Sequence, residues 1–146
     1  VAGKRLVLAG PDNALTLLDT ATGTKQKLAW PSILYGLDAP RTDDRGRLVA
    51  LAFADPAWQG GPRQAMDVWL LDTQTGELTH LPGMPALVDL KFTSMEWTSD
   101  GRLVFLAETD GKGLVAVWRP GAPELQVKPV RLPQRTSGSD SFAALP

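Results

Sequence analysis

GRLVFLA at Gly101–Ala107 and GRLVALA at Gly46–Ala52 are two copies of one segment, 55 residues apart. A third copy, KRLVLA, lies at Lys4–Ala9. A second segment recurs in the same order: LLDTATG at Leu17–Gly23 returns 53 residues later as LLDTQTG at Leu70–Gly76. Two matches of this length in matching order indicate an internal repeat, so the fold is assigned from the repeat before any local pattern.

Each repeat unit has the pattern of β-strands. The apolar segments are short and bounded by Gly, Pro, Asp and Asn, and no window keeps a helical apolar stripe over several turns. Asp19 and Asp72 can accept bonds from backbone NH groups two residues on, and Gly23 and Gly76 can take the positive φ that closes a hairpin. These aspartates are therefore interpreted as structural. Strands are predicted over 5–9, 15–19, 47–53, 67–72, 102–108, 114–118 and 125–132.

The unit resembles one blade of the TolB-type, WD40-like β-propeller repeat. WTSDGRLVFL at Trp97–Leu106 is similar to the Trp-Ser-Pro-Asp-Gly core of that repeat, and LLDTQTGELT at Leu70–Thr79 is similar to its next strand, turn and outer strand. The copies depart from the family at Thr98-Ser99, at Asp44-Arg45-Gly46 and at the degenerate third turn, Val117–Gly121. The resemblance implies an all-β fold of three four-stranded antiparallel blades, a partial ring or half of an oligomeric or larger propeller.

The whole chain is interpreted as a single propeller-type domain. Its blades are placed at about 1–30, 31–85 and 86–133, with a linker and candidate closing strand over 134–146. The first copy begins at its second strand, and Phe142–Leu145 is the candidate for the missing inner strand, in its own chain or another. The start at Val1 reads as a mature form or an excised piece.

Three blades do not close a ring. Propellers normally have about four to eight blades, because each blade buries its faces against neighbours. We therefore expect a protein partner, a second copy that closes a six-bladed ring as a homodimer, or the missing blades of a longer chain.

Equivalent strands of the copies are expected to share one facing pattern, because a slip of one residue turns every side chain to the opposite face. The alignment of the copies predicts that one set of residues points into the blade interfaces together: Leu6, Leu8, Leu48, Ala50, Leu103 and Phe105. The alternative is that the residues alternating with them, including Val7, Val49 and Val104, do so as a set.

Composition and charge exclude several classes of function. The 146 residues are 43% apolar and 21% charged, which is typical of one globular domain. A net charge of −1 without a basic run gives no electrostatic footprint for nucleic acid or an anionic membrane surface. No apolar stretch approaches the ~20 residues of a membrane span. The absence of cysteine excludes disulfides, thiolate catalysis and Cys-ligated zinc.

The remaining polar residues form no catalytic pattern. His80 is the one histidine, and no serine stands in a Gly-x-Ser-x-Gly setting. The aspartates fall mostly at hairpin turns and match no EF-hand spacing. We predict no catalytic residue, no metal site and no cofactor, and therefore no enzyme.

The tryptophans divide into two groups. Trp69, Trp97 and Trp118 lie within predicted strands and are expected in the core between blades. Trp30 and Trp58 lie in connections, and Trp58 belongs to a Gly- and Pro-rich insertion in the middle blade. Long loops on a rigid propeller are places for binding determinants. The predicted partner-binding residues are Trp58, Gln59, Arg63 and Trp30.

The leading interpretation is a non-catalytic, TolB-like propeller module that mediates protein recognition. One alternative is a lectin-like, carbohydrate-binding propeller, which requires Trp69 and Trp118 to be exposed. A second is an enzyme that uses carboxylates at the propeller axis. The resemblance implies an extracytoplasmic location in a bacterium, either periplasmic or secreted and cell-surface.

Overall fold

The computed structural model describes residues 5–10, 14–31, 37–54, 66–82, 94–109 and 112–131. All regular elements in this part of the chain are β-strands, arranged in three antiparallel sheets. Sheet 1 has the order β1-β2-β3, sheet 2 the order β4-β5-β6-β7 and sheet 3 the order β8-β9-β10-β11. The strands are β1 (Arg5–Gly10), β2 (Ala14–Asp19), β3 (Lys25–Leu28), β4 (Leu37–Thr42), β5 (Leu48–Ala54), β6 (Met66–Asp72), β7 (Leu78–His80), β8 (Ser94–Trp97), β9 (Leu103–Thr109), β10 (Lys112–Trp118) and β11 (Gln126–Val130).

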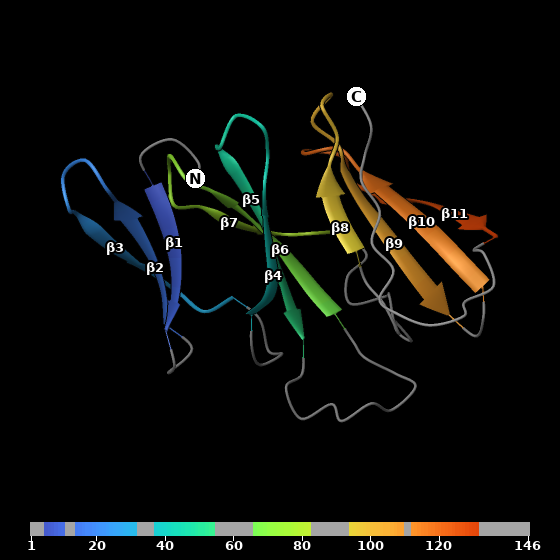
Figure 1. Cartoon of the computed structure of the whole chain (residues 1–146), viewed down its shortest axis with the longest axis horizontal. Helices are drawn as coiled ribbons and strands as arrows, with labels where there is room; N and C mark the ends of the chain where they lie inside the picture. The colour runs from blue at the N-terminus through green and yellow to red at the C-terminus, as the bar shows by residue number, and fades with distance from the viewer. Residues whose placement is uncertain are drawn as a thin grey trace.

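The three sheets lie side by side in sequence order (Figure 1). Sheets 2 and 3 have the four strands expected of a blade, whereas sheet 1 has three within the described residues. The candidate for its inner strand, Phe142–Leu145, lies outside those residues. The all-β fold in propeller-like blades is confirmed, and the predicted strands agree with the observed ones to within a few residues at their ends.

The core consists of two apolar clusters, one on each side of sheet 2. The cluster between sheets 1 and 2 contains Leu15, Leu17, Leu28, Val49, Leu51, Phe53 and Leu71. The cluster between sheets 2 and 3 contains Ala50, Ala52, Val68, Leu70, Leu81, Met95, Trp97, Leu103, Phe105, Ala116 and Trp118. Sheet 2 is therefore buried on both faces, which explains why β5 is apolar at every position from Leu48 to Ala54.

Alternation along the strands defines two faces for each sheet. We call the face toward the next sheet in the chain the forward face and the face toward the previous sheet the rear face. In β5, Ala50 and Ala52 belong to the forward face of sheet 2, and Val49 and Leu51 to its rear face. The indoles of Trp97 and Trp118 lie on the rear face of sheet 3, as the core prediction required.

The predicted facing pattern is wrong for the middle copy by one residue. Leu103 and Phe105 lie on a rear face, whereas Leu48 and Ala50, which were aligned with them, lie on a forward face. Strand pairing gives the true correspondence: Leu103 opposite Trp118 matches Val49 opposite Leu71 and Leu6 opposite Leu18. Val49 therefore faces the opposite way from Val7 and Val104.

A longer turn is the physical reason for this slip. In sheet 2 the NH of Asp43 donates to the carbonyl of Leu48, whereas in sheet 3 the NH of Thr98 donates to the carbonyl of Arg102, one residue closer. The Asp43 carboxylate closes the longer turn by accepting the NH groups of Arg47 and Leu48, at 2.8 and 2.9 Å. The identical Gly-Arg-Leu-Val sequences at 46–49 and 101–104 are therefore shifted by one residue relative to each other in the strand register.

Candidate functional site

The rear face of sheet 1 is uncovered within the described residues; it is apolar along β1, whereas Lys25 and Lys27 make its outer strand charged. Its β1 residues are Leu6 and Leu8, and Leu18 lies opposite Leu6 on β2. Leu8 is 42% exposed, whereas Leu51 and Phe105, its counterparts in sheets 2 and 3, are 0% exposed. The difference marks a blade face built like the buried ones but left without its neighbour.

The forward face of sheet 3, at the other end of the row of sheets, is covered by no other described sheet. Val104, Leu106, Val115 and Val117 alternate with the buried residues of β9 and β10, and all four are partly exposed. They match Ala50, Ala52, Val68 and Leu70 of sheet 2, which are buried against sheet 3. The described sheets therefore end in two faces of opposite type, each with apolar residues on its central strands.

The inner edge of sheet 1 is also incomplete. β5 and β9 each pair with a strand on both sides, whereas β1 pairs only with β2 among the described residues. The backbone groups on the other edge of β1 are a template for a further strand.

Aspartates organise the turns that gather along one edge of the sheets, at the top of Figure 1. The Asp19 carboxylate accepts the NH groups of Ala21 and Thr22, at 2.9 and 3.1 Å, and these bonds hold the pKa of Asp19 below its usual value. Asp72 makes the same turn in sheet 2 and accepts the NH of Gln74 at 2.8 Å. The structural interpretation of both aspartates is therefore confirmed.

Two ion pairs reinforce this rim. Burial alone would raise the pKa of Asp72, but the hydrogen bonds from Arg47, at 2.8 and 3.0 Å, together with its turn NH groups lower it. The hydrogen bonds that Arg102 and Thr98 donate to Asp100 lower its pKa to about 2. Both carboxylates are thus charged at neutral pH and engaged within their own sheet.

The rim also joins sheet 1 to sheet 2. The Arg5 guanidinium donates to the carbonyls of Thr73 and, at 3.1 Å, Gln74 in the β6–β7 turn. In the same turn, the Gln26 side chain lies so close to Gly76 (φ 77°) that an added Cβ would stand 2.4 Å from its Nε2. These contacts join the two sheets at one edge.

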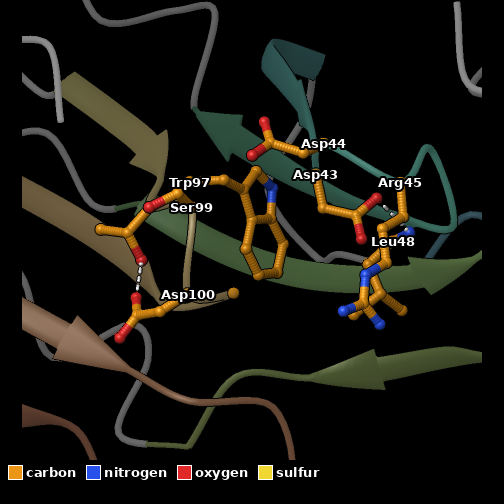
Figure 2. Close-up of a pocket in the computed structure, with 9 residues that line it drawn as sticks. Asp43, Asp44, Arg45, Leu48, Trp97, Ser99 and Asp100 are labelled. Atoms are coloured by element: carbon orange, nitrogen blue, oxygen red, sulfur yellow. Dashed lines mark hydrogen bonds between the residues drawn. The ribbon is translucent and has the colours of Figure 1, made fainter. Parts of the chain in front are cut away.

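A cavity of about 270 Å³ lies between the β4–β5 and β8–β9 turns, lined by Asp43, Asp44, Arg45, Leu48, Trp97, Thr98, Ser99, Asp100 and Gly101. Figure 2 shows the Trp97 indole standing between the two turns. Its Nε1 donates to the carbonyl of Arg41 at 3.0 Å, so the ring is fixed in place. Asp43 and Asp100 are occupied in holding their own turns, and no group of three metal-ligating side chains occurs in the described part of the chain.

His80 belongs to a small polar cluster on the rear face of sheet 2. Its Nε2 lies 2.5 Å from Oδ1 of Asp67, and Oδ2 of Asp67 accepts the Trp69 indole NH at 2.9 Å. The ring centroids of Trp69 and His80 are 4.9 Å apart. Asp67 is only 6% exposed, so two donors satisfy a carboxylate that is otherwise out of water. Sequence reasoning missed this cluster, because it depends on the pairing of Trp69 with His80 across β6 and β7.

The predicted partner-binding residues are only partly covered by the structure. Trp58, Gln59 and Arg63 lie outside the described residues, so their role stays a prediction. Trp30 packs edge-to-face on Phe53, with ring centroids 5.0 Å apart, and joins the core between sheets 1 and 2. Its buried indole NH has no hydrogen-bond partner among the described residues.

The tryptophans that the carbohydrate-binding alternative needs are not both accessible. Trp118 is 3% exposed, and its indole donates to the carbonyl of Ala122 at 3.0 Å. Trp69 is partly buried against His80 and Asp67. No helix in the described residues has the length and apolarity to cross a membrane.

Comparison with known proteins supports the fold. No protein-family model matches the chain, and no curated protein sequence matches it. The β-propeller domain of the Trilobed protease from Pyrococcus furiosus matches with a TM-score of 0.56 and 13% identity, over 90% of this chain and 41% of that one. Tricorn protease matches with a TM-score of 0.54 and 15% identity, over 84% of this chain and 13% of that one.

TolB from Acinetobacter baumannii is also similar, with a TM-score of 0.48 and 17% identity over 84% of this chain and 29% of that one. The chain thus spans less than half the length of each of these proteins. Matches to the two proteases at such identities establish the fold alone. The chain has the fold of part of a β-propeller.

Proposed function

We propose that this chain is a non-catalytic β-propeller module that recognises protein, and that its two outer sheet faces are the recognition surfaces. The observation that carries the proposal is the repetition of the buried interface pattern on those faces. Leu8 occupies the position that Leu51 and Phe105 occupy in the other sheets, yet only Leu8 is exposed.

Energetics favour a protein partner for these faces. Full burial of one leucine side chain contributes about 1.5–3 kcal/mol, and a contiguous apolar face of this kind is rarely left open on a soluble protein. A sheet face with Leu6, Leu8 and Leu18 resembles the faces that already pack on a neighbouring sheet within this chain, whereas a small ligand requires a concave site.

The non-catalytic part of the proposal is supported by the tasks that the acidic side chains perform. Asp19, Asp72 and Asp100 hold rim turns, and Asp67 binds Trp69 and His80. A carboxylate-based enzyme would need acidic groups available to a substrate at the propeller axis.

The segment with Trp58, Gln59 and Arg63 is proposed as a second protein contact. The extracytoplasmic location remains a prediction. Burial of Trp118 removes the main support for the carbohydrate-binding alternative.

A photoreactive amino acid placed at position 8 tests the proposal in cells of the source organism. Leu8 and Val127 are the two exposed large apolar residues in the described part of the chain, at 42% and 49%, and Val127 lies on the outer strand β11. The proposal predicts a covalent protein adduct from position 8 and none from the control at position 127. A folded variant that yields no protein adduct at position 8 would contradict it.

A further inference from the structure

We infer that the protein recognised by the outer faces is a second copy of this chain, joined head to tail. The forward face of sheet 3 in each copy packs on the rear face of sheet 1 in the other, and two such contacts close a ring. The inference rests on the proposed function and names its partner.

The chain already contains this contact twice. The forward face of sheet 1 meets the rear face of sheet 2, and the forward face of sheet 2 meets the rear face of sheet 3. In both contacts, apolar side chains of a forward face pack on apolar side chains of a rear face. Leu15 and Leu17 pack with Val49 and Leu51 in the first, and Ala50 and Ala52 pack with Leu103 and Phe105 in the second.

The two uncovered faces are one of each type. Sheet 3 offers a forward face, with Val104, Leu106 and Val117, and sheet 1 offers a rear face, with Leu6 and Leu8. One copy therefore carries both halves of a third contact of the same kind, at opposite ends of its row of sheets. Two copies satisfy all four open faces without any new type of contact.

Closure also fits the number of sheets. Two chains of three sheets give a ring of six, within the range of about four to eight blades that propellers use. A head-to-tail contact forms a closed ring only when the rotation per subunit divides the circle, and a two-fold axis relating two half-rings meets that condition.

Charges on the outer strands set the conditions for the test. Lys25 and Lys27 pair with the rear-face residues of β2, and Lys128 pairs with Val115 on the forward face of sheet 3. The forward face of sheet 3 also carries Glu96, opposite Val104, so the charges across the contact are mixed. The measurement is therefore made at about 0.15 M ionic strength, where the Debye length is about 8 Å.

The test is the mass of the purified chain by light scattering, with matched variants. The wild-type protein is expected at twice the chain mass of 15.7 kDa. Leu8→Glu and Leu106→Glu should each halve the observed mass, because each spoils both contacts of the ring. Val127→Glu, at a similarly exposed position on the outer strand, should leave the mass unchanged. Circular dichroism and thermal melting establish that each variant is folded.

A mixture of Leu8→Glu and Leu106→Glu distinguishes head-to-tail pairing from pairing of like faces. In the mixed pair, the unaltered sheet 3 of one copy meets the unaltered sheet 1 of the other, so one contact survives and a two-chain species returns. Like-face pairing predicts instead that one of the two variants keeps its full mass alone.

Wild-type protein at the single-chain mass at every concentration up to its solubility limit would overturn the inference, as would a folded Leu8→Glu variant that keeps the doubled mass. If that single-chain protein still forms an adduct from position 8 with a different protein in cells, the proposed function stands and only the identity of the partner is wrong.

Discussion

Leucine-to-alanine substitution at two equivalent positions, Leu51 and Leu8, measures how much each blade face is covered. Leu51 is 0% exposed between sheets 1 and 2, so its truncation removes buried methyl groups and leaves a cavity. We expect Leu51→Ala to lower the free energy of unfolding by about 3–5 kcal/mol. Leu8 is 42% exposed, so in the separated chain Leu8→Ala should cost about 1 kcal/mol, the transfer free energy of a half-buried side chain.

Urea denaturation followed by tryptophan fluorescence, at several protein concentrations, provides the assay. The loss of unfolding free energy caused by Leu8→Ala should increase with protein concentration, because a second copy then covers that face. The loss caused by Leu51→Ala should not depend on concentration, because Leu51 is already buried within one chain. If Leu51→Ala does not fold, the milder pair Leu51→Val and Leu8→Val gives the same comparison with smaller values. Equal costs at the lowest concentration would show that Leu8 is covered within one chain and would refute the reasoning.

Three further predictions concern the rim. Gly76→Ala should destabilise the protein more than Gly23→Ala in thermal melts, because both glycines have φ above 70° but only Gly76 lies under a side chain of sheet 1; equal losses would exclude that contact. Asp43→Ala should cost about 1–2 kcal/mol in urea, through loss of two NH acceptors, whereas Asp44→Ala at the exposed neighbouring position should cost nearly nothing; a reversed order would contradict the turn geometry. The turn aspartates have lowered pKa values in the folded protein, so the unfolded chain takes up protons first as the pH falls. The stability that they contribute is therefore present above about pH 4 and is lost as the pH falls toward 2. Asp100→Asn should make this loss of stability smaller, and an unchanged dependence on pH would argue against the Asp100 ion pairs.

The repeat predicted most of the fold because it carries local and long-range information together. The DTxTG turns located both hairpins that Asp19 and Asp72 close, and the match between Leu17–Leu18 and Leu70–Leu71 placed equivalent strands in equivalent sheets. Short apolar segments between such turns have few alternatives to antiparallel pairing.

Register in the middle copy could not be read from matching letters. Gly46 and Gly101 both precede an Arg-Leu-Val sequence, but the turn around Gly46 contains one more residue. The departure at Asp44-Arg45 was the available signal, because a different turn sequence permits a different turn length. Facing is determined by hydrogen-bonded pairs, which a comparison of letters does not contain.

The candidate site was predictable in kind but not in place. Open faces followed from the number of blades, whereas the burial of Trp30 on Phe53 depends on how a connection folds back over the core. The binding of His80 to Asp67 likewise required the register of β6 with β7. The sequence alone could not pair these two side chains, because it does not contain the register of the two strands.

The most direct test of the head-to-tail ring identifies which surfaces of two copies are in contact. Purified chains carrying the photoreactive residue at position 8 are mixed in unlabelled and ¹⁵N-labelled forms, irradiated at about 0.15 M salt, and analysed by mass spectrometry. The head-to-tail ring predicts mixed-isotope crosslinks from position 8 to the segment 104–117 of the other copy. Crosslinks confined to chains of one isotope, or mixed crosslinks that join position 8 to β1 or β2 of the other copy, would contradict it.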